Sequence, residues 1–243
     1  MKKFIWGPSK RTAGSTLSTF DENFFMKDND KFSPGEELAN AISHLTGTLL
    51  AIAALILMIN HSLANGNNLH LLSTAVFGTS MILLYTSSTL THILPMGKAK
   101  DRFFNMDRIA IYILIAGTYT PIALITLNGP LGWTIFGIEW GMALVGTMMI
   151  LIRPGDFHSG VNTFYVLSYA IMGWLVLIAI GPIFKSLPLM GGIWIFIGGL
   201  AYTVGIIFFK SIKFPYHHLV WHLLVIAGTV SHFIAVYFFI IPS

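Results

Sequence analysis

Residues 38–59, LANAISHLTGTLLAIAALILMI, contain no Asp, Glu, Lys or Arg in 22 positions. A helix rises about 1.5 Å per residue, so a run of this length can cross the roughly 30 Å hydrocarbon core of a bilayer. Six similar runs follow, separated by short breaks with turn residues such as Asn128-Gly129-Pro130. They cover residues 71–94, 109–127, 131–152, 161–181, 189–209 and 216–241. The pattern predicts an all-α fold, a bundle of seven transmembrane helices.

The composition supports the same class of protein. The 243-residue chain is 55% hydrophobic and 10% charged, with a mean hydropathy of +0.74, whereas soluble domains carry roughly 25% charged residues. Too few polar side chains are present to cover a water-exposed surface, so we expect one membrane domain over residues 33–243. The chain has no cysteine. Disulfides are therefore excluded, and a transition metal would need histidine, carboxylate or water ligands.

The basic residues predict how the bundle is oriented. With the N-terminus inside, 13 of the 14 Lys and Arg residues fall in inner segments, and Lys185 falls on the outer side. Loops rich in Lys and Arg stay on the cytoplasmic side of a membrane, so the N-terminus is expected inside and the C-terminus outside. The same placement explains the net charge of +4 without a nucleic-acid partner, because the basic residues do not form one binding face.

The first 32 residues are polar apart from a Phe-rich patch between Phe20 and Phe25, and they predict a cytoplasmic arm rather than a cleavable signal peptide. The first helix is expected to begin at Ser33-Pro34-Gly35-Glu36. Serine can cap the helix, proline suits its first turn, and Glu36 can bond back to the cap.

Polar and ionisable residues gather near the inner end of the predicted bundle. Inside a membrane such residues are costly and usually functional. The first and second helices each carry three on one face, an aspartate opens the third helix, and two histidines open the seventh. The residues are Glu37, Asn40 and His44; Tyr85, Ser88 and His92; Asp107; and His218 and His222. In the predicted topology all of them lie in the inner leaflet, at one depth.

His218 and His222 are the strongest candidates for metal ligands. Their i, i+4 spacing places both imidazoles on one helix face, one turn apart. A third ligand from His92 would give three neutral nitrogens and leave a fourth position for water, which is the arrangement of a catalytic zinc site. Asp107 can hold that water or act as a general base. Ser88 can donate to an oxyanion or orient a ligand.

Other histidines have simpler interpretations. A lone histidine at a helix end is often a hydrogen-bonded or interfacial residue, and His44 is open to that interpretation. His61, His70 and His158 are expected in loops. His232 lies on the same helix face as His222, roughly 15 Å deeper. It can line a cavity that runs outward from the site, or simply bond to a neighbouring helix.

The order of the motifs resembles that of a known family. STLTH at 88–92, MD at 106–107 ahead of IAIYILIAGTYTP, and HLVWH at 218–222 ahead of LLVIAGTVSHF are similar to the hemolysin III branch of the progestin and adiponectin-type receptor (PAQR) superfamily. EELANAISH at 36–44 resembles the first-helix motif of that branch. The resemblance extends over nearly all of the chain after its N-terminal arm.

This resemblance implies roles for individual residues. In the adiponectin-receptor relatives, zinc is bound by the histidine of the second-helix motif and by both histidines of the last-helix pair. These positions match His92, His218 and His222. The aspartate that opens the third helix approaches the zinc through water there, and it matches Asp107. The serine of the second-helix motif matches Ser88.

Arg108 departs from the family pattern, because bacterial relatives usually carry histidine after the aspartate. The change leaves the three-histidine set intact. An ion pair between Arg108 and Asp107 would, however, make that carboxylate a poorer general base.

The resemblance also implies a zinc-binding protein of lipid homeostasis, in the plasma or inner membrane of a bacterium, with membrane lipids as its partners. The adiponectin-receptor relatives resemble lipid-amide hydrolases of the ceramidase type. One hypothesis is therefore an enzyme in which zinc activates water to attack an amide or ester carbonyl of a lipid.

Three alternatives belong to other classes. The chain can be a non-catalytic sensor or regulator of membrane composition in which zinc is structural. A hemolytic pore is disfavoured, because seven spans of this kind insert only during synthesis. An ion channel is a further alternative, given His232, although we expect no charged residue near mid-bilayer.

Overall fold

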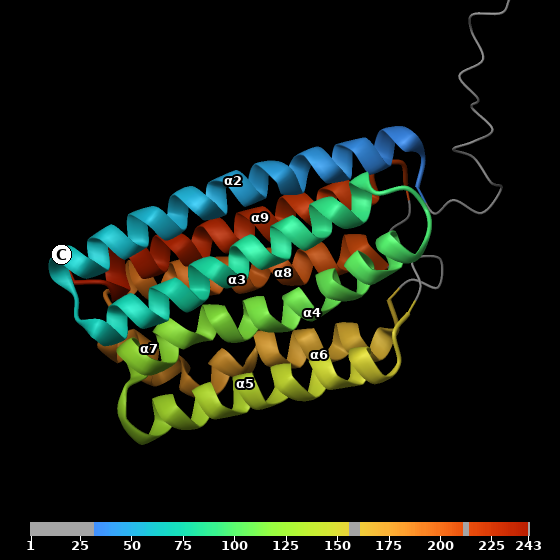
Figure 1. Cartoon of the computed structure of the whole chain (residues 1–243). Helices are drawn as coiled ribbons and strands as arrows, with labels where there is room; N and C mark the ends of the chain where they lie inside the picture. The colour runs from blue at the N-terminus through green and yellow to red at the C-terminus, as the bar shows by residue number, and fades with distance from the viewer. Residues whose placement is uncertain (1–31, 156–160, 211–213, 243) are drawn as a thin grey trace, which may run out of the picture. The chain divides into compact units, whose positions relative to one another are not determined.

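A computed structural model describes residues 32–155, 161–210 and 214–242. All regular elements in these ranges are helical, and seven spans are long and apolar enough to cross a membrane. The predicted all-α fold and the number of spans are thus confirmed (Figure 1). The arm expected over residues 1–32 lies outside the described ranges except for Phe32, and its role stays a prediction.

The first four spans comprise the helices from α2 to α5. They are α2 (Pro34–Asn65), α3 (Asn68–Ile93), α4 (Lys98–Pro121) continued by the π-helix η1 (Ile122–Leu127), and α5 (Gly129–Ile152). The fifth span is divided, and the last ends in a π-helix. These later spans are α6 (Thr163–Gly173) with the 3₁₀-helix η2 (Leu175–Ala179) and α7 (Ile180–Ser186), α8 (Leu189–Lys210), and α9 (His217–Ala235) with η3 (Val236–Ile240).

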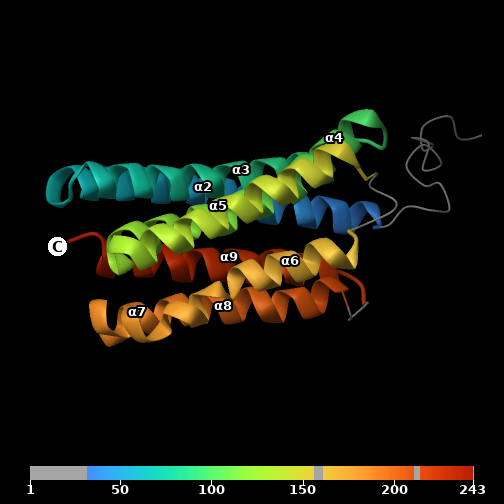
Figure 2. The same cartoon turned by 90° about the horizontal axis from the view of Figure 1, so that it is seen from below.

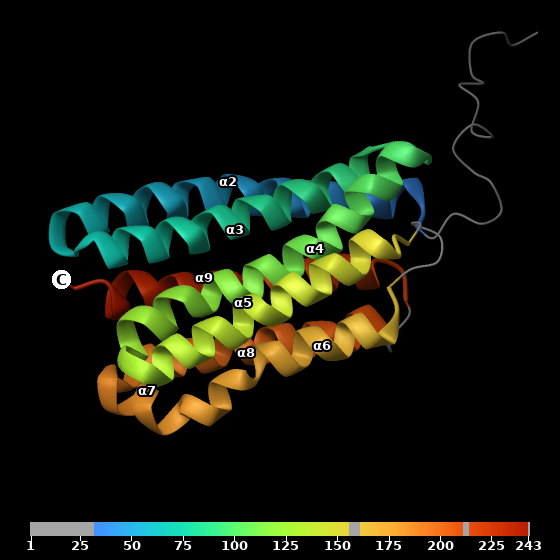
Figure 3. The same ribbon diagram turned by 60° about the horizontal axis from the view of Figure 1, so that its bottom comes forward.

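The first and last spans lie side by side. α2 packs against both α3 and α9, α4 joins α3 to α5, and α8 packs on α9. Figure 2 shows the bundle from below, and Figure 3 shows α4 beside α5, with α6 and α7 running along α8. The starts of α2 and α9 and the end of α3 share one end of the bundle (Figure 1), which we call the histidine end.

The start of α2 confirms the predicted cap and links it to α9. Glu36 N donates to Ser33 Oγ at 3.3 Å, and Ser33 N donates to Glu36 Oε2 at 2.9 Å, with Pro34 in the first turn. The other carboxylate oxygen of Glu36 accepts from Tyr216 N, just before α9, at 2.8 Å. One side chain therefore caps the first span and holds the start of the last one.

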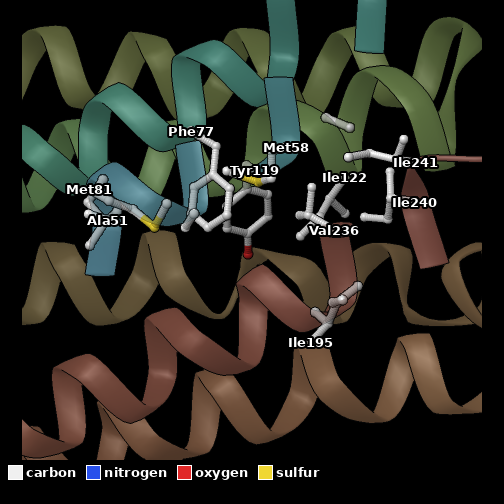
Figure 4. Close-up of a cluster of buried hydrophobic side chains, with 14 of the residues drawn as sticks. Ala51, Met58, Phe77, Met81, Tyr119, Ile122, Ile195, Val236, Ile240 and Ile241 are labelled. Atoms are coloured by element: carbon white, nitrogen blue, oxygen red, sulfur yellow. The ribbon is translucent and has the colours of Figure 1, made fainter. Parts of the chain in front are cut away.

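The hydrophobic core lies where α2, α3, α4 and α9 meet. Figure 4 shows Met58, Phe77, Tyr119 and Ile122 from the first three of these spans near Val236 of the last. α4 and η1 form the most enclosed span, with 72% of its apolar window buried against between 22% and 44% in the others. The other spans carry exposed apolar side chains on their outer faces, as expected of helices that contact lipid.

The fifth span continues past its predicted end and is interrupted inside. It was expected over residues 161–181, but it runs from Thr163 to Ser186, with 3₁₀ geometry over Leu175–Ala179. The physical reason is Pro182. A proline lacks an N–H group and its ring crowds the carbonyl four residues earlier, so the helix deforms one turn before it and then resumes.

Two further expectations are wrong. His61 lies within α2 and His70 within α3, where His70 closes a cap with Asn67, so neither is a loop residue. His158 lies outside the described ranges. The expectation of no charged residue near mid-bilayer overlooked an ionisable one, because Glu139 is close to the middle of α5 and is fully buried. This residue was missed because it interrupts an otherwise apolar run only once.

Candidate metal centre

Three histidines from two helices meet at the histidine end. His92 lies in the last turn of α3, and His218 and His222 lie one turn apart near the start of α9. One ring nitrogen from each is within 4.8 Å of the other two. His92 and His222 are buried, and His218 is partly buried. The structure therefore brings the predicted ligands together in a group that could hold a metal ion.

α2 orients the imidazole of His92. Nδ1 of His92 lies 2.5 Å from Glu37 Oε2, and the other oxygen of Glu37 accepts from Lys100 Nζ at 2.8 Å. A carboxylate can only accept, so Nδ1 carries the hydrogen and the lone pair is on Nε2. Metal-binding histidines in proteins are oriented in this way, by a carboxylate or carbonyl on the nitrogen that does not bind. Glu37, an unassigned polar candidate from the sequence, thus acquires a positioning role.

α2 orients His222 as well. Its Nδ1 lies 3.0 Å from Ser43 Oγ and 3.2 Å from the backbone oxygen of Asn40. The Ser43 hydroxyl donates its own hydrogen to Asn40 O at 2.8 Å, so both oxygens accept from Nδ1–H and Nε2 is left for a metal. The sequence prediction missed Ser43. Its only signal was the i, i+3 spacing from Asn40 on the face that carries Glu37 and His44.

Aromatic rings surround His218. Its imidazole centroid lies 4.9 Å from Phe32, 5.7 Å from Phe209 and 4.5 Å from His222. Phe32 is itself 7% exposed and lies 6.0 Å from the His92 ring. An apolar surround of this kind limits access of water to the site and strengthens electrostatic interactions inside it.

His44 is buried beside the group but is not part of it. Its ring stacks on His222 at 3.5 Å between centroids and 13° between planes, and meets Tyr85 edge-on at 5.1 Å. Neither ring nitrogen has a hydrogen-bond partner within the described ranges, nor has the buried side-chain amide of Asn40. His44 is therefore a buried residue whose ring packs between a candidate ligand and Tyr85.

Asp107 and Ser88 lie next to each other but outside the ligand group. The Ser88 hydroxyl is buried and makes no hydrogen bond of regular geometry in the described structure, and the Asp107 carboxyl is its neighbour. Arg108 does not form the ion pair considered above. Its Nη1 donates to Asn105 Oδ1 at 3.2 Å, and its guanidinium lies 4.5 Å from the centre of the Tyr165 ring. Among the described residues, the Asp107 carboxylate is not neutralised by its neighbour.

The deeper polar residues of α9 are bonded to neighbouring helices. Tyr85 and Tyr202 each bond to Thr229 Oγ1, at 2.8 Å and 2.9 Å. His232 Nε2 donates to the backbone oxygen of Ile195 in α8 at 3.1 Å. The structure thus favours the simpler interpretation of His232, as a residue that bonds to a neighbouring helix.

The donor set limits which metals fit. Three imidazole nitrogens suit zinc and other late first-row ions, whereas magnesium and calcium prefer oxygen ligands. Within the described ranges, no cysteine, carboxylate or fourth histidine joins the group. The residues present therefore fit a late first-row ion such as zinc.

Comparison with known proteins extends the match of the motifs to most of the bundle. A family model described as haemolysin-III related matches residues 32–233. The chain is 42% identical over 208 residues to Hemolysin-3 of Bacillus cereus, covering 86% of this chain and 93% of that protein. The Hemolysin-3 homolog of Bacillus subtilis (strain 168) is also 42% identical over 208 residues, with 86% and 96% covered. The human monocyte to macrophage differentiation factor is 28% identical over 174 residues, with 69% and 70% covered.

Proposed function

The chain belongs to the haemolysin-III-related family of the PAQR superfamily, and from that premise we propose a zinc-dependent membrane hydrolase that cleaves an amide or ester bond of a lipid. The observation that carries the proposal is the group of three imidazoles, two of which are oriented by acceptors on α2 that bond to their Nδ1 atoms. A closed structural zinc site would instead present four protein ligands.

Six residues have a defined task in this proposed reaction. His92, His218 and His222 would hold the zinc, whose contribution when bound is Lewis-acid activation of water. Asp107 accepts the proton of the attacking water and passes it to the leaving amine or alkoxide. Ser88 donates its hydroxyl hydrogen to the carbonyl oxygen of the lipid as negative charge develops there. Glu37 keeps His92 in the tautomer that binds metal.

Metal content is the first test. Elemental analysis of detergent-purified protein should give about one zinc per chain, because the described residues contain one group of three nitrogen donors. His92→Ala and the double variant His218→Ala/His222→Ala should lose it. His217→Ala is the matched control, since its ring bonds to Phe208 O outside the group. Absence of zinc from folded wild-type protein that has never met a chelator would refute the proposal.

Turnover is the second test. Wild-type protein should release fatty acid or amine from members of a membrane-lipid library, and His92→Ala should not. Asp107→Asn and Ser88→Ala should keep the zinc and lose most of the turnover. Removal of a single general base or hydrogen-bond donor typically costs about 100-fold or more in rate. Zinc-loaded wild-type protein that hydrolyses no lipid in the library would contradict a catalytic role.

A structural role for the metal is the second candidate, and one observation favours it. The three histidines come from α3 and α9, which both pack on α2, so a metal would join them directly. Loss of ligands would then lower stability, while Asp107→Asn and Ser88→Ala would leave the cellular function unchanged. These two variants therefore separate an enzyme from a regulator that contains structural zinc.

A further inference from the structure

Glu139 is a carboxyl group buried in the interior of the bundle, remote in sequence from the metal centre. It is the eleventh residue of the 24-residue helix α5 and is 0% exposed. Neither carboxyl oxygen has a hydrogen-bond partner in the described ranges. Its neighbours on the same face are Ile135 and Ala143, which are buried apolar residues one turn away on either side. The enzyme mechanism proposed above makes no use of this group.

The neighbourhood of Glu139 on α4 is polar and irregular. The phenol of Tyr119 lies within electrostatic range of the carboxyl. Trp140, the next residue of α5, donates Nε1–H to Thr120 Oγ1 at 3.1 Å and ties the two helices at this level. Two residues after Tyr119 comes Pro121, where the α-helix gives way to the π-helix η1. Glu139 thus faces a region in which α4 departs from regular geometry.

Tyr119 connects Glu139 to the interruption in the fifth span. The Tyr119 hydroxyl accepts from Val176 N at 2.6 Å and donates to Gly173 O at 3.0 Å. These two backbone groups flank the point at which α6 ends and η2 begins. Broken helices near the middle of membrane proteins commonly mark binding sites, because their freed backbone groups need polar partners.

Among the residues that the structure describes, those around Glu139 offer no compensating positive charge. α4 contributes Tyr119 at this level, while its Tyr112 packs against Gly146, about two turns nearer the histidine end. η1 contains no titratable residue. The tyrosines of α6, Tyr165 and Tyr169, lie near Arg108 at the histidine end. A carboxylate without a counter-charge is very costly in such a place, whereas the neutral acid costs far less.

We propose that Glu139, which lies within electrostatic range of Tyr119 at the interrupted fifth span, is an intramembrane proton-binding site separate from the histidine group. The ligand is the proton itself, carried on the carboxyl as a neutral acid. Loss of that proton would place a negative charge within electrostatic range of the phenol that bonds to Gly173 O and Val176 N. Protonation of Glu139 would thereby be coupled to the geometry of the fifth span.

A hydrophobic carbodiimide tests the site directly, because this class of reagent converts a protonated carboxyl in an apolar setting into a stable N-acylurea. Treated membranes containing the full chain should carry the adduct on the peptide with Glu139, as measured by mass spectrometry. Labelling should fall about tenfold per pH unit once the carboxyl ionises. Glu139→Gln should abolish it, and Glu139→Asp should retain it. The peptide that contains Asp101, in the first turn of α4, is the internal control.

Infrared spectroscopy supplies a second measurement that does not depend on reagent access. A protonated carboxyl in an apolar site gives a C=O stretching band that should be present in wild type and in Glu139→Asp and missing from Glu139→Gln. Absence of both the adduct and the band from folded wild-type protein would overturn the proposal. So would protection from labelling by added sodium at constant ionic strength, since that result would assign the site to a metal cation.

The proton site does not depend on the proposed hydrolase. Labelling and the carboxyl band should be the same in wild type, in His92→Ala and in chelator-treated protein. A failure of the zinc assays would therefore leave this inference standing, and a failure of carbodiimide labelling would leave the metal centre untouched.

Discussion

The carboxylate of Glu37 contacts two buried groups at once, the Nδ1 of His92 and the Nζ of Lys100. Lys100 is 2% exposed and also donates to Leu94 O, which follows α3. The charge of Glu37 is thereby compensated on one side while its other oxygen orients a candidate ligand. A buried charge that is paired in this way is tolerated. Because the pairing already compensates the desolvation of Glu37, its contact with His92 adds no further desolvation cost.

Glu37→Gln should weaken metal binding without removing it. The amide is a poorer acceptor than a carboxylate, so the preferred tautomer of His92 is held less firmly, and loss of such partners typically lowers metal affinity about 10- to 100-fold. Competition titration with a zinc chelator measures the change. Glu36→Gln is the matched control, because Glu36 contacts Ser33 and Tyr216 but none of the three histidines. Equal affinities in Glu37→Gln and wild type would show that this contact has no positioning role.

At the scale of the element, the interrupted fifth span depends on a side chain from another helix. Tyr119→Phe should destabilise the bundle by about 2 kcal/mol, because Val176 N and Gly173 O both lose a partner inside an apolar region. Thermal unfolding in detergent gives the comparison. Tyr237→Phe serves as the control, since no hydrogen bond of the Tyr237 hydroxyl is found within the described ranges. If Tyr119→Phe unfolds at the same temperature as wild type, the interrupted fifth span does not need the hydrogen bonds of the Tyr119 hydroxyl.

The contact between α4 and α5 depends on a glycine. A side chain at Gly146 would run into the Tyr112 ring, so Gly146→Val should destabilise by about 1–3 kcal/mol through overpacking. Gly137→Ala provides the contrast, because a methyl group there meets no atom within 4 Å. Unfolding midpoints of the two variants should therefore separate clearly. If they coincide, α5 can shift away from α4 at little cost.

At the scale of the whole molecule, the candidate ligands lie on two helices, α3 and α9. A bound metal ion would link these helices at the histidine end of the bundle. Chelation should therefore lower the unfolding midpoint of wild type, since a ligand at about 1,000 times its Kd stabilises the folded state by about 4 kcal/mol. His92→Ala should unfold at the lower midpoint with or without chelator. A chelator effect of the same size in this variant would place the stabilising metal elsewhere.

Much of this architecture is predictable from the sequence, because apolar run length and His-x-x-x-His spacing are local signals. The seven spans and the meeting of His92 with His218 and His222 follow from them. The roles of Ser43 and Lys100 could not be predicted in this way. A short hydroxyl or a single lysine becomes a hydrogen-bond partner of a site residue only through tertiary packing. The fifth span was predicted to end at residue 181, just before Pro182, whereas it continues to Ser186, because only the tertiary structure shows that the helix resumes after a proline. Metal identity, turnover and membrane orientation stay predictions.

The pairing of α2 with α9 at the histidine end also governs when the molecule can be completed during synthesis. His92 is translated long before His218 and His222, and the groups that orient His222 belong to the first span. Until the seventh segment leaves the exit tunnel, a ribosome-bound chain therefore contains one candidate ligand, His92, and the two oxygen atoms of Asn40 and Ser43 that later accept from His222. Every stalled or shortened product that stops before residue 218 lacks two of the three nitrogens. Such products would lack the complete group of nitrogen ligands, and therefore the metal that this group would hold.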